Sequence, residues 1–165
     1  MIKSDSGKQV MLALEDYLDA LYDRAYEIVD AHWAVVREME RKSSGWENKS
    51  ELQLRCNRKG NSIVLAWNRV RWYGSKQKGN RMRQLIHIAK PAGSYAYSLS
   101  KLLPFAKEWE QPLVRETEEK LAAIRQEASH VVKAVIALRH ALNRAASVPM
   151  EESVEEENDA SSNQP

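Results

Sequence analysis

The stretch ELQLRCNRKGNSIVLAWNRVRWY, residues 51–73, decides the fold class of this chain. In its first part, Leu52, Leu54 and Cys56 alternate with polar residues, which is the period of a strand with one buried face. Residues 58–61, Arg-Lys-Gly-Asn, are typical of a tight hairpin turn. The β-branched and aromatic residues of 62–73 then predict a second strand that pairs with the first.

The pattern continues beyond this hairpin toward the C-terminus. Residues 74–80 form a basic loop with two glycines, and residues 81–89, RMRQLIHIA, predict a third strand. Residues 50–90 therefore read as a basic, antiparallel β-meander. A short helix is expected over residues 98–105, with Ser98 or Ser100 near its N-cap.

Two long helices are expected on either side of the meander. In the first, residues 10–42, apolar or near-apolar residues recur at alternating spacings of three and four: Met11, Leu14, Leu18, Leu21, Ala25, Ile28, His32, Val35 and Met39. The second begins near Pro112 and repeats the pattern at Val114, Thr117, Leu121, Ile124, Ala128, Val131, Val135, Leu138, Leu142 and Ala145. Such spacing is the heptad pattern of helices that pack along their length.

These elements define an α+β fold, a three-stranded antiparallel β-meander flanked by two long heptad-patterned α-helices, in the order α-β-β-β-α-α. Residues 1–150 are expected to form one domain, with residues 98–146 as its C-terminal helical region. Residues 151–165 contain six acidic and no basic residues, so a disordered acidic tail is expected there. Whether the long helices pair within one chain or between two chains stays open.

Charge is divided unevenly along the chain, although the net charge is only +2. Residues 49–107 contain 13 Lys and Arg but a single acidic residue, Glu51. Residues 1–48 carry 10 acidic and 6 basic residues. A basic segment of this strength is the pattern expected of a surface that contacts the phosphates of nucleic acid.

The second hairpin brings several of these cations to one end. In an antiparallel pair of strands, the C-terminal half of 62–73, the following loop and the start of 81–89 converge, and they contribute Arg69, Arg71, Lys76, Lys78, Arg81 and Arg83. Trp72 and Tyr73 lie at the same end. The expected nucleic-acid-binding set also includes Arg55, Arg58 and Lys59 around the first turn, and Lys90 and Tyr95 in a second basic loop.

Three modes of binding fit this surface. A two-stranded ribbon enters the major groove of double-stranded DNA, where arginine reads guanine. Alternatively, Trp72 and Tyr73 stack on unpaired bases of RNA or single-stranded DNA. In the third mode the chain is a coiled-coil adaptor whose basic module docks on an acidic protein. In the duplex-binding mode the long helices form a dimer or a bundle scaffold, and a homodimer would match two half-sites.

Catalysis is not expected. The four histidines form no HExxH or HxH motif, and there is no GxSxG, Walker or GxGxxG motif. Tyr95 and Tyr97 invite comparison with tyrosine nucleophiles that act on DNA, but no histidine cluster accompanies them. The lone Cys56 permits no internal disulfide, and no metal or other cofactor is expected.

The start of the chain is unlike a signal peptide, and no apolar run is long enough to span a membrane, so a cytoplasmic protein is expected.

One family resembles this layout. The resemblance rests on a long N-terminal helix, the basic meander, the loop 90–98 (KPAGSYAYS), the segment 106–110 (AKEWE), and the run from Glu116 to Arg125. Together they resemble the MobI family of conjugative-transfer proteins over residues 10–145. The resemblance implies a bacterial, non-enzymatic auxiliary mobilisation factor that recognises the origin of transfer and helps to position a separate relaxase. The resemblance assigns no binding role to any individual residue. The expected binding site therefore follows from charge alone.

Overall fold

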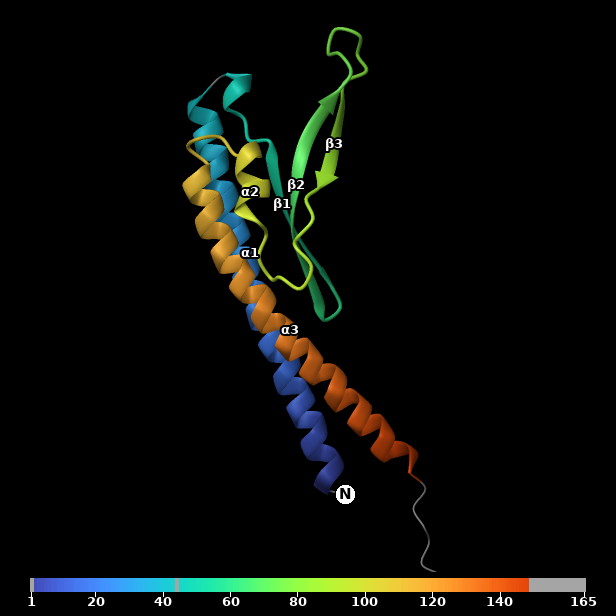
Figure 1. The fold of residues 1–165 in the computed structure, drawn as a ribbon. Helices are drawn as coiled ribbons and strands as arrows, with labels where there is room; N and C mark the ends of the chain where they lie inside the picture. The colour runs from blue at the N-terminus through green and yellow to red at the C-terminus, as the bar shows by residue number, and fades with distance from the viewer. Residues whose placement is uncertain (1, 44, 149–165) are drawn as a thin grey trace, which may run out of the picture.

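A computed structural model describes residues 2–43 and 45–148 of the chain. The predicted tail at 151–165 lies outside the described residues. The elements follow the order α1 (Ile2–Lys42), η1 (Trp46–Asn48), β1 (Leu52–Lys59), β2 (Ser62–Tyr73), β3 (Met82–His87), α2 (Leu99–Leu102), η2 (Leu103–Phe105) and α3 (Gln111–Ser147). Three antiparallel strands in one sheet with helices at both ends confirm the α+β fold. In Figure 1, α1 and α3 run side by side, and the sheet lies beside the end of α1 and the start of α3.

The first long helix, α1, differs from expectation at its start and along one face, whereas α3 begins where the sequence predicted. α1 begins at Ile2, whereas the heptad pattern predicted a start near residue 10. α3 begins at Gln111 with Pro112 in its first turn, as proline at that position predicts. Near the end of α1 the buried position is Val36, while Val35 is exposed. A helix turns every 3.6 residues, so a stripe with a period of 3.5 moves round its surface.

The two hairpins of the sheet are staggered along β2. β1 pairs with β2 from Lys59↔Ser62 to Leu52↔Arg69, and β3 pairs with β2 from Asn68↔His87 to Tyr73↔Met82. The last residues of β2 therefore have β3 on one side and no strand on the other. In Figure 1 the β2–β3 hairpin consequently projects past β1 and away from the helices.

The core lies between the helices and one face of the sheet. Trp67 of β2 is fully buried there with Leu54 and Leu65, against Ala25 of α1 and Leu121 of α3. A second cluster continues between the helices beyond the sheet and joins Leu18, Leu21, Tyr22, Ala128 and Val135. Burial of these apolar side chains, at roughly 25 cal/mol per Å², is the main force that joins sheet and helices.

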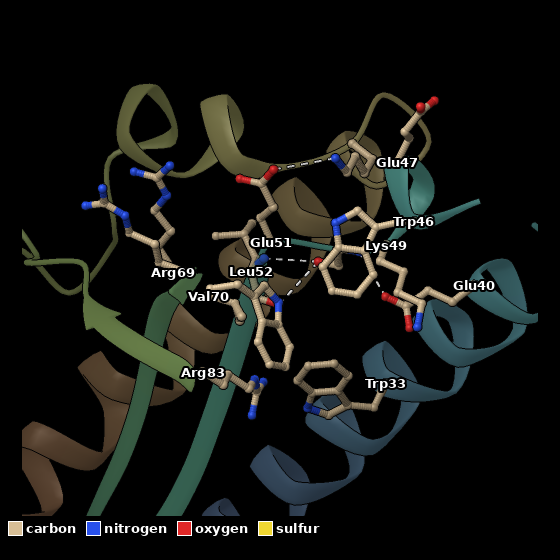
Figure 2. Close-up of a pocket in the computed structure, with 14 residues that line it drawn as sticks. Trp33, Glu40, Trp46, Glu47, Lys49, Glu51, Leu52, Arg69, Val70 and Arg83 are labelled. Carbon is tan, nitrogen blue, oxygen red and sulfur yellow. Dashed lines mark hydrogen bonds and ion pairs between the residues drawn. The ribbon is translucent and has the colours of Figure 1, made fainter. Parts of the chain in front are cut away.

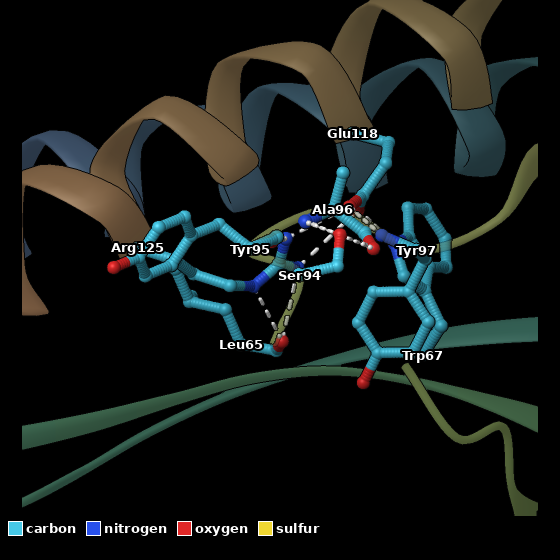
Figure 3. A network of polar contacts seen from close by, with 8 residues as sticks. All are labelled: Leu65, Trp67, Ser94, Tyr95, Ala96, Tyr97, Glu118 and Arg125. Carbon is cyan, nitrogen blue, oxygen red and sulfur yellow. Dashed lines mark hydrogen bonds and ion pairs between the residues drawn. The ribbon is translucent and has the colours of Figure 1, made fainter. Parts of the chain in front are cut away.

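A buried ion pair fastens α3 to β2 and to the loop that follows β3 (Figure 3). Arg125 donates to Glu118 Oε1 at 2.8 Å, to the carbonyl of Leu65 at 3.0 Å and to the carbonyl of Tyr95 at 2.9 Å. Glu118 also accepts from Trp67 Nε1 and from the Tyr97 amide, each at 2.7 Å. Each carboxylate oxygen is therefore hydrogen-bonded, which is the condition for tolerating a buried charge.

Two more buried polar groups join segments of the core: His32 joins α1 to α3, and Glu110 joins the start of α3 to the segment before β1. His32 of α1 lies 3.0 Å from the hydroxyl of Thr117 on α3, and its burial lowers the pKa of the imidazole to about 4. Glu110, at the start of α3, accepts a hydrogen bond from Ser50 Oγ at 2.5 Å, and burial raises the pKa of its carboxyl. His32 is thus a core residue, in keeping with its place in the heptad pattern.

None of the helices within the described residues is long and apolar enough to cross a membrane.

Candidate nucleic-acid interface

Residues 71–83, here called the hairpin tip, carry a group of cations that are exposed except for Arg81, which is half-buried. Glycine is required where the loop begins, because Gly74 has φ +75° and an added Cβ would lie 2.3 Å from the Asn80 carbonyl oxygen. The Asn80 side chain accepts from the Ser75 amide at 2.9 Å and closes the loop. This fixed turn presents five cations and no carboxylate, namely Arg71, Lys76, Lys78, Arg81 and Arg83.

The cations of the tip are spread over both faces of the hairpin. Tyr73 pairs with Met82 and Trp72 pairs with Arg83, so the alternation of side chains places Arg71 with Tyr73 and Arg83 with Trp72. The Arg71 guanidinium lies 4.8 Å from the centre of the Tyr73 ring. A ribbon with cations on both faces can contact the two phosphate backbones that border a groove.

Arg81 sits at the join between the tip and η1. Its guanidinium lies 4.2 Å from the ring centre of Trp46 and 4.6 Å from that of Trp72. The two indole rings are themselves 5.8 Å apart and inclined at 58°. These cation–π contacts hold Arg81 in place without neutralising its charge.

Arg69, predicted to belong with this group, is placed differently. It faces the helices, its guanidinium lies 4.4 Å from the centre of the Phe105 ring, and its side chain is half-buried. Its buried Nε has no hydrogen-bond partner among the described residues. Arg69 therefore lies at the edge of the core, behind the exposed cations of the tip.

The first turn lies at the opposite end of β2, about 36 Å from the tip at 3.3 Å per residue. Arg58 is ion-paired there with Asp19 and lies over the Tyr22 ring. Arg55 and Lys59 are exposed. The structure thus does not bring these three residues together with the tip.

The second basic loop is also separate from the tip. Lys90 is exposed, whereas Tyr95 is half-buried with its ring 6.4 Å from that of His130 on α3. Tyr97 is buried, and burial raises the pKa of its hydroxyl. Tyr97 is thus part of the core, whereas Tyr95 is only partly covered by α3. No group of three or more metal-ligating side chains occurs within the part of the chain that the structure describes.

A pocket of about 590 Å³ lies at the base of the tip, beside the edge of β2 that β1 leaves open. We call it the tryptophan pocket. In Figure 2, Trp33 of α1, Trp46 of η1 and Arg83 of β3 point toward the same space. Its full lining is Trp33, Glu40, Trp46, Glu47, Lys49, Ser50, Glu51, Leu52, Arg69, Val70, Arg71, Trp72, Arg83 and Lys107.

Of the fourteen lining residues, the sequence predicted four as binding residues and did not predict the other ten, among them Trp33, Trp46, Lys49 and Lys107. Trp46 follows Ser43-Ser44-Gly45, and a tryptophan in a polar connection between two elements is a signal that the sequence did contain. Trp33 lies on α1 next to His32, and nothing in the local sequence distinguishes it from the core residues around it. Only the packing of α1 beside β2 places its ring in the pocket.

Few carboxylates lie near the cations of the tip in the sequence. Glu51, the single acid of residues 49–107, lies 3.6 Å from Lys107 in an ion pair. The ammonium groups of Lys76 and Lys78 form no ion pair with any described residue. Unpaired, exposed cations are the ones available to an incoming polyanion.

Fold and surface together define an α+β protein with a projecting basic β-hairpin. The family model described as MobI protein matches residues 21–139, so the chain belongs to the MobI family. Membership indicates a mobilisation-related protein. No curated protein and no solved structure is significantly similar to the chain.

Proposed function

We propose that this protein is a non-enzymatic, DNA-binding auxiliary factor of conjugative transfer. In this role it recognises the origin of transfer in the bacterial cytoplasm and helps to position a separate relaxase. One observation carries the DNA-binding part: the hairpin tip presents five cations without a carboxylate. Family membership supports the link to mobilisation.

The hairpin tip fits duplex DNA by its shape. A two-stranded antiparallel ribbon has the width of the major groove, which is about 12 Å. Lys76 and Lys78 at the end of the ribbon would contact phosphates, while Arg83, on the strand itself, lies where it would reach base edges. Arg71 on the opposite face would contact the backbone across the groove.

The long helices provide a rigid base for the hairpin and a surface for protein partners. Beyond the sheet, α1 and α3 continue as a pair on which Val10, Leu12 and Ile136 are exposed. We propose that this part of the molecule serves in homodimerisation or in contact with the relaxase. A dimer would present two tips to two half-sites and would raise the affinity of each weak contact by proximity.

The decisive experiment measures binding of the full chain to a labelled duplex of the transfer origin by fluorescence anisotropy. A scrambled duplex of the same length and composition is the control. The proposal expects tighter binding to the transfer-origin duplex. Equal affinity for both duplexes would reduce the function to non-specific DNA binding, and absence of binding would refute it.

Exposure of Trp72 and Tyr73, at 44% and 40%, favours single-stranded nucleic acid as the second candidate, because exposed rings can stack on unpaired bases. Single strands of DNA and RNA as competitors in the same assay separate this candidate from duplex binding. The adaptor alternative predicts instead that a protein partner remains bound after nuclease treatment.

A further inference from the structure

The tryptophan pocket has the composition of a site for a nucleobase. Three indoles, Trp33, Trp46 and Trp72, line it. Its volume of about 590 Å³ falls within the range of about 300–1,000 Å³ that is usual for small-molecule sites. Aromatic faces bind bases by stacking, and they accept any base because every base has a π-face.

Charges around the pocket match the remainder of a nucleotide. Its lining includes cations from four different segments, Lys49, Arg69, Arg71, Arg83 and Lys107. Phosphate oxygens require such donors. Three carboxylates, those of Glu40, Glu47 and Glu51, also line the pocket. Glu51 is ion-paired with Lys107 at 3.6 Å, and one oxygen of Glu40 accepts from the Ser50 amide at 2.9 Å. A carboxylate is suited to accept a hydrogen bond from the exocyclic amino group of a base.

The position of the pocket connects it to the hairpin tip. Trp72 and Arg83 are paired residues on neighbouring strands, and both contribute to the tip and to the pocket. Arg81 contacts the rings of Trp46 and Trp72. DNA held by the tip would therefore pass beside the mouth of the pocket.

From these observations we infer that the tryptophan pocket takes up a single unpaired base of the DNA held by the hairpin tip. This inference rests on the proposed function. The pocket makes the protein selective for DNA in which a base is already unpaired, because an unpaired base enters without the loss of pairing and stacking. Such selectivity would direct the protein to distorted or partly opened duplex.

The test compares a fully paired duplex with the same duplex carrying one unpaired adenine. Wild-type protein is expected to bind the bulged duplex about 10-fold more tightly, in line with the stacking of one base on aromatic side chains. Trp46→Ala is expected to lower this ratio of affinities to about one. Trp46 is 52% exposed, so its removal should leave the fold intact, and circular dichroism checks this.

Tyr73→Ala is the matched control, since it removes an exposed aromatic ring of the tip that does not line the pocket. The ratio of the affinities for the bulged and the fully paired duplex should persist in this variant. A ratio that falls with Tyr73→Ala but survives Trp46→Ala would overturn the inference and place the stacking on the tip itself.

A second measurement uses the wild-type protein alone. With 2-aminopurine as the unpaired base, contact with an indole ring of the pocket is expected to quench its fluorescence on binding. Equal affinity for paired and bulged duplexes, without quenching, would overturn the pocket while leaving the proposed function in place. Failure to bind either duplex would instead refute the proposed function.

Discussion

Trp67 and Trp72 lie five residues apart on the same strand, yet Trp67 is fully buried and Trp72 is 44% exposed. Trp67 donates to a carboxylate that Arg125 neutralises, and each group in that network has a partner. Trp72 lies beside Arg81 in a region where no carboxylate accompanies the cations of the tip. At the buried end of β2, a carboxylate of the same chain balances the charge of the arginine. At the exposed end, Arg81 lies against Trp72, and residues 71–83 contain no carboxylate to balance its charge.

Removing Arg125, which pairs with Glu118 at the buried end, should give the largest loss of stability. Arg125→Ala leaves the Glu118 carboxylate buried without its counter-ion and leaves the carbonyls of Leu65 and Tyr95 without a donor. The free energy of unfolding is expected to fall by about 3–5 kcal/mol. Urea denaturation followed by circular dichroism measures this.

Lys120→Ala is the control for that variant. Lys120 is ion-paired with Glu116 on the exposed face of α3. Its loss should change the free energy of unfolding by less than about 0.5 kcal/mol. Equal effects of the two substitutions would contradict a structural role for the buried network.

The buried end should also make stability depend on pH through His32. Burial lowers the pKa of this imidazole to about 4, whereas the unfolded chain takes up the proton near its ordinary value of about 6.5. The contribution of neutral His32 to the free energy of unfolding is therefore complete above pH 6.5. It is lost as the pH falls toward 4. At about 1.4 kcal/mol per pH unit, the total loss is about 3 kcal/mol.

His32→Gln isolates this effect from other titrating groups. Glu110 contributes in the opposite direction, since its raised pKa favours the folded state as the pH falls. Subtracting the denaturation curves of His32→Gln from those of the wild type removes that contribution. The stability difference should shrink between pH 6.5 and 4, and a constant difference would exclude His32 as the source.

The smallest change in stability is expected from replacing the two tryptophans of β2 by phenylalanine. Because the same substitution is made at both ends of one strand, the two variants are closely matched. Trp67→Phe keeps an aromatic ring but removes the hydrogen bond to Glu118, at a cost of about 1–3 kcal/mol. Trp72→Phe at the exposed end should change the free energy of unfolding by less than about 0.5 kcal/mol. Thermal or urea denaturation of both variants measures this, and similar losses would show that the exposed end is also structural.

The sequence predicted the elements because their patterns are local. Alternation at Leu52, Leu54 and Cys56, the turn at Gly60 and the helix start at Pro112 depend only on neighbouring residues. The pairing of Glu118 with Arg125 and Trp67 could not be inferred in the same way. Glu118 and Arg125 lie on one helix, but their burial depends on β2 and on the loop before Ser98 packing against it.

The candidate site was predicted unevenly for the same reason. Arg71, Lys76, Lys78, Arg81 and Arg83 follow from the antiparallel hairpin, whose register is a local matter. Arg69 was grouped with them because it lies on the same strand, but Phe105 of η2 packs against it. Arg58 was included for its charge, yet Asp19 of α1 neutralises it. Tertiary contacts decide which cations remain available.

If the hairpin tip is the DNA-contacting surface, its cations set the salt dependence of the affinity for the transfer-origin duplex. Each phosphate contact contributes about 0.9 to the slope of log affinity against log salt concentration. Arg71→Ala, Lys76→Ala and Lys78→Ala combined should therefore lower the slope by between about 2 and 3 relative to wild type.

The matched control removes three exposed cations of α3 instead, with Lys133→Ala, Arg139→Ala and Arg144→Ala combined. Net charge changes equally in the two variants, so only the position of the lost charge differs. The tip variant should lose slope while the control retains the wild-type value. A slope unchanged in the tip variant, or lowered equally in both, would contradict the assignment of the hairpin tip as the DNA-contacting surface.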